Sequence, residues 1–141
     1  MDTIRTLAII KPDAVRAGNA GKVLSMIEGS GLSVDAMRMF RLTREVAGEF
    51  YAVHRGKAFY EKLLDFMSSG PCIALVLSGV DAITRWRELM GVTNPESAAE
   101  GTIRKLYGTD VQSNACHGSD APETARQEMA FFFSGAELPK S

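Results

Sequence analysis

The feature that most constrains the fold is the alternation of short, apolar, β-rich segments with stretches of helical spacing. The segment "TLAII" (6–10) stops at "KPD", where Pro12 removes an amide donor and pushes Lys11 toward an extended conformation. A strand should therefore deliver Lys11 at its end. The segment "PCIALVL" (71–77) is a predicted buried strand that begins at Pro71. Two more segments have the composition of strands, at 32–42 and 128–133.

Apolar residues at helical spacing fill the intervals between these strands. Asn19 is a suitable N-cap for a helix that ends near Gly29. Further helices are expected from the N-cap Thr43 to about residue 54, over 58–67 and over 80–91. The order β-α-β-(α)-β-α-β predicts an α+β fold, the ferredoxin-like split β-α-β sandwich, with helices over one face of a four-stranded antiparallel sheet.

The length of 141 residues, 45% of them hydrophobic, suits a single domain spanning 1–141. Residues 92–127 differ from the rest, because glycines, prolines and small polar residues leave only short helical pieces such as "GTIRKLY" (101–107). A loop of this length inside a compact domain is usually functional or disordered. This region is therefore a candidate location for functional residues.

Charge and cysteine content exclude several classes of protein. Sixteen Lys and Arg against seventeen Asp and Glu give a formal net charge of -1, so nucleic acid is not expected as the main partner. Cys72 and Cys116 are too few for a disulfide framework and form no zinc-type CxxC pair. No segment resembles a signal peptide or reaches the roughly 20 apolar residues of a membrane span. These features predict a cytoplasmic protein that does not bind membranes.

The heptapeptide "NACHGSD" (114–120) leaves four interpretations of His117 open. A metal site needs several converging ligands, and the adjacent Cys116 would usually point away from the histidine. A Ser-His-Asp hydrolase draws its triad from separate segments and often has a GxSxG turn, which is absent. The ring can also be a nucleophile, because an imidazole is largely neutral at pH 7 without special activation. Taken alone, the heptapeptide favours the fourth interpretation, a packed histidine in a polar turn.

Residues elsewhere in the chain favour the nucleophile. Glu128 could accept a proton from one ring nitrogen and leave the other free to attack. Phosphoryl transfer needs cations and hydrogen-bond donors around the moving group, although any single arginine could be ordinary surface charge. The loop and its flanks supply four such groups, Lys11, Arg87, Thr93 and Arg104. Neither GxxxxGK[ST] nor GxGxxG is present, so side chains would have to bind the phosphates.

Five motifs, in this order along the chain, resemble those of the nucleoside diphosphate kinase family. They are "IIKPDAV" (9–15), "SGP" (69–71), "RELMGVTNP" (87–95), "GTIR" (101–104) and "NACHGSD" (114–120). The similarity runs from about residue 5 to 135, and the combination is highly specific. It implies a ping-pong reaction in which a nucleoside triphosphate, mainly ATP, gives its γ-phosphoryl group to a histidine that passes it to a nucleoside diphosphate. By position, His117 would be that phosphohistidine.

The resemblance also implies roles for the residues around the histidine. Lys11 would contact the ribose hydroxyl and the γ-phosphate, and Tyr51 would lie near the transferred group. Ser119 and Glu128 would orient the ring. Mg2+ would arrive with the nucleotide, and Asp120 would lie in its outer shell, which fits the reluctance of magnesium to lose water.

The nucleotide itself would be held along its whole length. Asn114 would bind the 3'-hydroxyl, and His54 would lie near the α-phosphate. Phe59 would stack on the base and Val111 would contact its other face, which suits a kinase that accepts all bases because stacking reads no base edge. The β- and γ-phosphates would be gripped by Arg87, Thr93 and Arg104.

The chain departs from the usual family pattern at four positions. Val53 replaces a residue that is often acidic, and Glu100 replaces a proline. The segment "KLYG", which begins at Lys105, replaces "GDFG", and Ala121 replaces a serine. These departures leave the metal shell and the rate open, but they remove no residue assigned to chemistry.

The family assembles as dimers grouped into tetramers or hexamers. The chain stops soon after "FFFSGAELPKS", without the longer extension of many hexameric members, so a tetramer or dimer is favoured and a hexamer stays open. The alternative function is a catalytically silent nucleotide-binding or interaction module on the same fold. The complete set of His117, Ser119, Glu128 and Lys11 argues against it.

Overall fold

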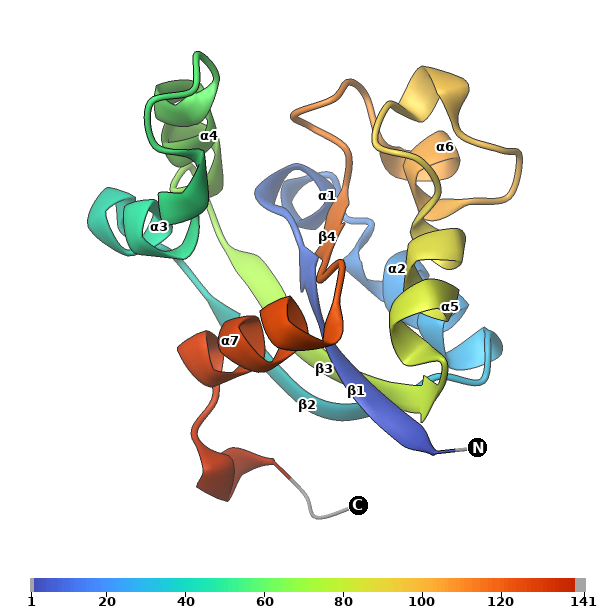
Figure 1. The fold of residues 1–141 in the computed structure, drawn as a ribbon. Helices are drawn as coiled ribbons and strands as arrows, with labels where there is room; N and C mark the ends of the chain where they lie inside the picture. The colour runs from blue at the N-terminus through green and yellow to red at the C-terminus, as the bar shows by residue number, and fades with distance from the viewer. Residues whose placement is uncertain (1, 139–141) are drawn as a thin grey trace.

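The computed structural model describes residues 2–138 and contains a four-stranded antiparallel sheet in the order β2-β3-β1-β4 (Figure 1). Its strands are β1 (Thr3–Ile10), β2 (Ser33–Phe40), β3 (Cys72–Val80) and β4 (Cys116–Gly118). β1 pairs with β3 along its whole length, and its last residues pair with β4. The predicted ferredoxin-like α+β fold is confirmed. Residues 1 and 139–141 of the predicted domain lie outside the described residues.

Most of the predicted helices are present. The hydroxyl of Thr43 accepts a hydrogen bond from the backbone N–H of Val46 at 3.1 Å and so caps the helix that follows, as expected. The short helix α1, directly after β1, was not predicted. The described helices before the last are α1 (Pro12–Arg16), α2 (Ala20–Gly29), α3 (Arg44–Phe50), α4 (Tyr60–Met67), α5 (Ala82–Met90) and α6 (Ile103–Tyr107).

The predicted fourth strand at 128–133 is wrong. Residues 128–132 form the C-terminal part of helix α7 (Pro122–Phe132), and the fourth strand is β4, which contains the candidate histidine. A short apolar run cannot be assigned to a strand or a helix by periodicity alone, and here it is the end of an amphipathic helix that begins at a proline. The real strand has only three residues, too few to show an alternation.

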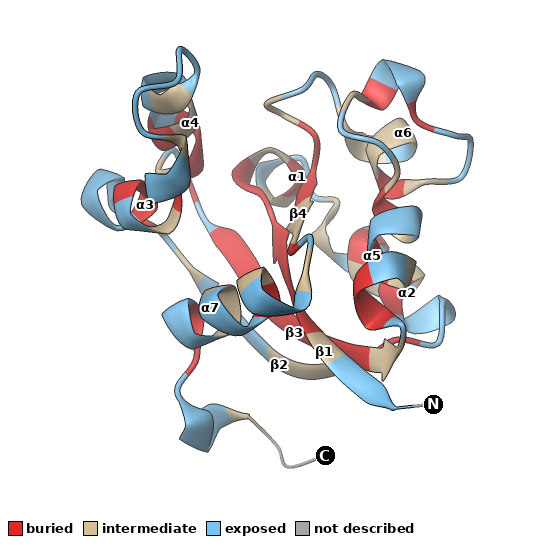
Figure 2. Ribbon diagram, in the orientation of Figure 1, coloured by how far each residue is buried: buried red, intermediate tan, exposed pale blue. Residues whose placement is uncertain are grey.

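Helices cover both faces of the sheet, not one face as predicted (Figure 1). On one face Leu75 and Leu77 pack with Trp86 of α5 and with residues of α2. On the other face Leu7 and Ile9 pack against α3, α4 and α7. β1 and β3 are therefore buried along most of their length (Figure 2), which explains why they were the clearest strands in the sequence.

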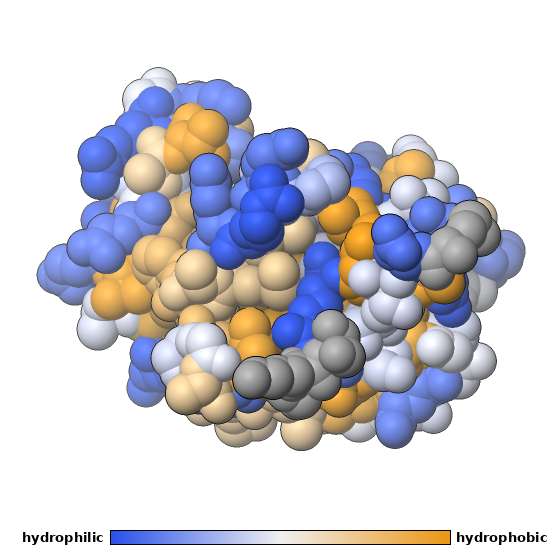
Figure 3. All heavy atoms as spheres, turned by 60° about the horizontal axis from the view of Figure 1, so that its bottom comes forward, coloured by the Kyte–Doolittle hydropathy of each residue, from blue (hydrophilic) through white to orange (hydrophobic). Residues whose placement is uncertain are grey.

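β2 is different, because it lies at the edge of the sheet and is largely exposed. It runs along the bottom of Figure 1, and Figure 3 turns that side forward and shows apolar patches among hydrophilic ones. Met37 and Met39 of this strand are 56% and 59% exposed. Within residues 2–138, no helix has the length and apolar character needed to cross a membrane.

Candidate active site

Strand β4 places His117 in register with Ile9 of β1, beside helix α7. Its Nε2 atom lies 2.8 Å from Oε1 of Glu128, and the Ser119 hydroxyl donates to the same oxygen at 2.7 Å. A carboxylate can only accept hydrogen bonds, so this contact assigns the ring proton to Nε2. Nδ1 then carries the free lone pair. The structure brings His117, Ser119 and Glu128 together as predicted, but Glu128 comes from helix α7 and not from the expected strand.

The backbone and ring of His117 are held by residues that sequence reasoning missed. The indole Nε1 of Trp86 donates to the His117 carbonyl oxygen at 3.2 Å, and the Phe50 ring meets the imidazole edge-on at a centroid distance of 5.5 Å. A Cβ atom at Gly118 would lie 2.6 Å from the Trp86 ring, so only glycine fits there. Nothing in the sequence marks Trp86 or Phe50 for this task, because it depends on where α5 and α3 pack.

Lys11 is delivered by the end of β1 as predicted, and its side chain is only 8% exposed. Its Nζ donates to Oδ1 of Asn114 at 2.8 Å, and Nδ2 of Asn114 donates to the Thr93 carbonyl oxygen at 3.1 Å. Burial, and then repulsion by the Arg104 charge, lowers the pKa of Lys11 to about 8. The structure thus links three predicted residues from three separate segments around one poorly solvated cation.

Arg104, at the start of α6, is anchored by backbone oxygens. Its two terminal nitrogens donate to the carbonyl oxygens of Gly91 and Cys116, each at 2.9 Å. Burial lowers the pKa of this guanidinium, and its Nε has no hydrogen-bond partner among the described residues. The arginine therefore holds the loop against β4 and keeps its charge beside Lys11.

A pocket of about 630 Å³ lies between α5 and the loop that follows it. Its walls include Arg87, Thr93, Arg104 and Asp120, four of the residues predicted to bind phosphate or metal. His117 and Lys11 are not among the residues that line it, so this pocket contains only part of the predicted site. Its cations and polar groups suit an anion.

Asp120 is the one predicted metal residue. Its Oδ1 accepts a hydrogen bond from the Thr124 hydroxyl at 2.9 Å. Among residues 2–138 there is no group of three or more His, Cys, Asp or Glu side chains that could hold a metal ion. The described residues therefore form no protein cage for a metal ion.

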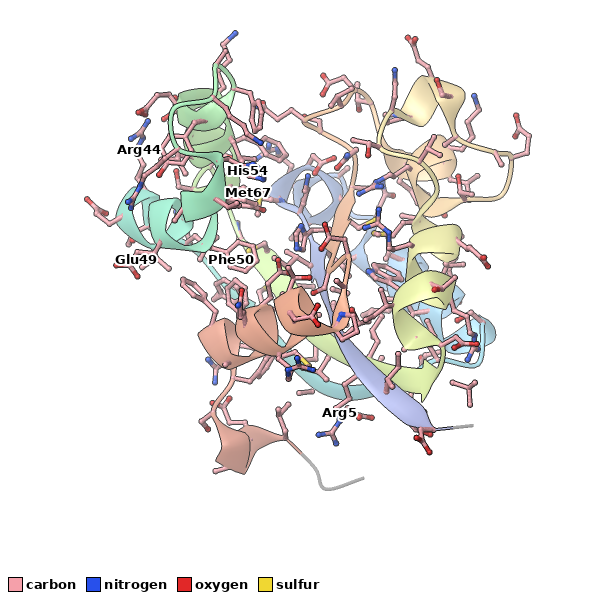
Figure 4. All side chains as sticks on the ribbon, in the orientation of Figure 1. Arg5, Arg44, Glu49, Phe50, His54 and Met67 are labelled. Atoms are coloured by element: carbon pink, nitrogen blue, oxygen red, sulfur yellow. The ribbon has the colours of Figure 1, made fainter. Side chains whose placement is uncertain are left out.

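The segment from α3 to α4 supplies the aromatic side of the site. Tyr51 is buried, its ring meets His117 at a centroid distance of 6.3 Å, and its hydroxyl has no hydrogen-bond partner within residues 2–138. Burial, and then the charge of Glu128, raises the pKa of Tyr51, so the hydroxyl stays protonated and can donate. Figure 4 shows Phe50 and His54 on the side of this segment that faces β4, whereas Arg44 and Glu49 lie on its outer side.

The residues predicted to contact the base are far more exposed. Phe59 is 47% exposed and packs against His54 at a ring distance of 5.3 Å. Burial, and then the Lys57 charge, lowers the pKa of His54, whose Nδ1 lies 3.4 Å from Lys57 Nζ. Val111 is 56% exposed in the loop between α6 and β4. The structure therefore brings Phe59 to His54.

The structure shows the environment of two residues that depart from the usual family pattern, Val53 and Lys105. Val53 is 80% exposed on the turn after α3, so an acidic residue there would be solvated. Lys105 reaches the Glu96 carbonyl oxygen at 3.3 Å, which ties α6 to the short turn Pro95–Ser97.

Comparison with known proteins agrees with this geometry. The family model described as nucleoside diphosphate kinase matches residues 4–138. A nucleoside diphosphate kinase of Oleidesulfovibrio alaskensis is 55% identical over 95% of this chain and 96% of its own, and one of Persephonella marina is 51% identical over 98% and 99%.

Solved structures give the same result. An Aquifex aeolicus nucleoside diphosphate kinase superposes with a TM-score of 0.95 at 49% identity, covering 98% of this chain and 100% of that one. The enzyme of Halobacterium salinarum in complex with CDP superposes with a TM-score of 0.94 at 39% identity, covering 99% and 93%. With its fold, its histidine, serine and glutamate in contact, and these relatives, the chain belongs to the nucleoside diphosphate kinase family.

Proposed function

We propose that this protein is a nucleoside diphosphate kinase in which His117 carries the phosphoryl group between a nucleoside triphosphate, mainly ATP, and a nucleoside diphosphate. The observation that carries the proposal is the 2.8 Å contact between Nε2 of His117 and Glu128. This contact favours the tautomer whose Nδ1 lone pair is free to attack. One kinase domain accounts for the whole chain.

In the first half-reaction, Nδ1 attacks the γ-phosphorus in line with the bond to the β,γ-bridging oxygen. The N–P bond forms as that P–O bond breaks, and the nucleoside diphosphate leaves with the electron pair. The ring becomes positively charged, and Glu128 stabilises that charge through the Nε2–H hydrogen bond, with Ser119 holding the carboxylate. A second nucleoside diphosphate then attacks the phosphohistidine and reverses these steps.

Charged and polar groups of the site would stabilise the moving phosphoryl group. Lys11 and Arg104 are held in place by protein atoms before any nucleotide arrives, so they need little reorganisation. Arg87 and Thr93 share the pocket with Arg104 and would bind the β- and γ-phosphates. The unpaired hydroxyl of Tyr51 would donate to the transferred group.

Mg2+ is proposed to arrive on the nucleotide, with Asp120 binding one of its water ligands. The position of Asp120 in the wall that carries Arg87, Thr93 and Arg104 supports this role. When bound, the ion would neutralise charge on the β- and γ-phosphates.

The rest of the nucleotide would lie between the α3–α4 segment and the loop before β4. Phe59 would stack on the base and Val111 would cover its other face, while Asn114 would hold the 3'-hydroxyl and His54 the α-phosphate side. The Halobacterium salinarum relative in complex with CDP supports a nucleotide site of this kind. Apolar, exposed contacts such as these would discriminate little between bases.

We also propose that the chain forms a homo-oligomer, a dimer or tetramer before a hexamer. An exposed edge strand with Met37 and Met39 on its surface supports association, since such edges are usually covered. Cys72 and Cys116 are both buried and free, which supports the expected cytoplasmic, reducing location.

The test is labelling with ATP that carries isotope in the γ-phosphate. The protein should retain label that is stable in base and lost in acid, as for a phosphohistidine, and should pass it to an added nucleoside diphosphate. His117→Ala should lose both label and turnover while keeping its melting temperature. The chain has two histidines, so His54→Ala is the matched control and should still become labelled.

Two outcomes would contradict the proposal. Substantial turnover by His117→Ala would remove the histidine from the mechanism. An unlabelled wild-type protein that still binds nucleotide would support the catalytically silent binding module.

A further inference from the structure

The backbone just before the histidine has an unusual conformation. Ala115 has a φ of 74°, in the left-handed region that residues with a β-carbon avoid. The N–H of Cys116 donates to the carbonyl oxygen of Asn114 at 2.9 Å, so residues 114–116 form a γ-turn of the rare, strained type. Such a turn persists only where surrounding contacts hold it.

Those contacts come from the first turn of α1. Oδ2 of Asp13 accepts a hydrogen bond from the Ala115 N–H at 3.1 Å, and the Lys11 N–H donates to the Ala115 carbonyl oxygen at 2.9 Å. Ala115 is fully buried, so its N–H depends on a protein acceptor such as Asp13. The other oxygen of Asp13 is buried and has no partner within residues 2–138, so the Ala115 bond is the main contact of this carboxylate.

The γ-turn sets the direction of groups on both of its sides. Before it, Asn114 binds Lys11 through its side chain. After it, Cys116 accepts a hydrogen bond from Arg104 through its carbonyl oxygen and starts the strand that presents His117. A change at Ala115 would therefore move the nucleophile and its cations relative to one another.

We propose that Asp13 is a positioning residue for phosphoryl transfer, because its hydrogen bond to Ala115 holds the γ-turn that aligns Asn114 and His117. This inference rests on the proposed kinase function. Asp13 acts through the backbone and touches neither the nucleotide nor the reacting atoms. Misplacing a nucleophile by a small distance mainly lowers the rate of the chemical step.

The experiment measures the single-turnover rate of His117 labelling at saturating ATP, together with nucleotide affinity and melting temperature. Asp13→Ala should slow labelling by about tenfold or more, with a smaller change in affinity. Asp13→Asn keeps an acceptor oxygen and should stay within about threefold of the wild type. Adding Ala115→Gly to Asp13→Ala makes a positive φ acceptable and should recover several-fold of the lost rate.

The matched control is Asp35→Ala, which removes a partly buried carboxylate bound by Arg5 and Ser78 far along the sheet and should leave the labelling rate unchanged. If Asp13→Ala does not fold, Asp13→Ser replaces it, since a shorter side chain cannot span the same distance. Wild-type labelling in whichever variant folds, or no recovery with Ala115→Gly, would overturn the inference. An unlabelled wild-type protein would overturn the proposed function, and the inference with it.

Discussion

The two sides of the candidate site differ in how firmly they are held. On the phosphate side, Asn114 and Ser119 are 2% and 1% exposed, and Lys11 and Arg104 hydrogen-bond to protein atoms. On the proposed base side, Phe59 and Val111 expose about half of their surface. Phe59 precedes α4, which Arg44 ties to α3 through Glu61 and Asp65.

This difference assigns different work to the two sides. Groups that are fixed before the substrate arrives stabilise a transition state without reorganising, so the phosphate side should control the rate. Exposed apolar surfaces contribute affinity with little selectivity, so the base side should control KM and tolerate many bases. Changes at Lys11 and Phe59 test this division, and a change at Ala121 tests the helix that carries Glu128.

Lys11→Met should lower kcat/KM by on the order of 100-fold, because a cation about 4 Å from a phosphate charge contributes roughly 4 kcal/mol before desolvation. The apolar replacement fills the buried site, so the melting temperature should not fall. Steady-state kinetics with ATP and a nucleoside diphosphate measure the effect. A loss below about threefold would mean that Arg104 and Mg2+ suffice without the lysine.

The pKa of Lys11, lowered to about 8, gives a second test of the phosphate side. Lys11 is charged below that pH and loses its proton as the pH rises through it, so kcat/KM should be level below about 8 and fall above it. Bound phosphate favours the charged form, so kcat at saturation should hold to higher pH. Lys11→Arg stays charged, so its kcat/KM should fall only at higher pH. An unchanged pH profile would contradict the assignment of the fall to Lys11.

On the base side, Phe59→Ala should raise KM by about tenfold with little change in kcat, because stacking on one base contributes about 1–3 kcal/mol. The rise should be similar for purine and pyrimidine substrates. Leu106→Ala removes an equally exposed apolar side chain, on α6, and should change neither constant. A loss in kcat that exceeds the rise in KM would break the division between the two sides.

The smallest effect concerns the helix that carries Glu128. Ala121 is the N-cap of α7 and has no side-chain oxygen to accept a hydrogen bond, so Ala121→Ser should stabilise the protein by about 1 kcal/mol. Thermal unfolding should show a rise of about 3 °C with unchanged kcat. Ala130→Ser, at an exposed position within the same helix, is the control and should give no rise.

The sequence located most of the candidate site because its residues lie in short contiguous motifs. The motif "KPD" ended β1 and delivered Lys11, and "NACHGSD" contained the candidate nucleophile together with Asn114 and Ser119. The same local information failed for Glu128, whose apolar neighbours suggested a strand where α7 forms. It also failed to predict α1, because this helix is too short to show helical spacing. The position of Asp13, which lies in α1, was therefore not predicted either.

What the sequence determined by itself is the α+β class, the two central strands and the family, since buried apolar runs and contiguous motifs are local properties of the chain. Only the tertiary structure decided which nitrogen of His117 is free, why the pKa of Lys11 is low and how Ala115 is held in its γ-turn. These properties arise where distant segments meet, as Asp13 and Ala115 do across 102 positions. Burial and hydrogen-bond partners at such a meeting point depend on packing, which no window of sequence contains.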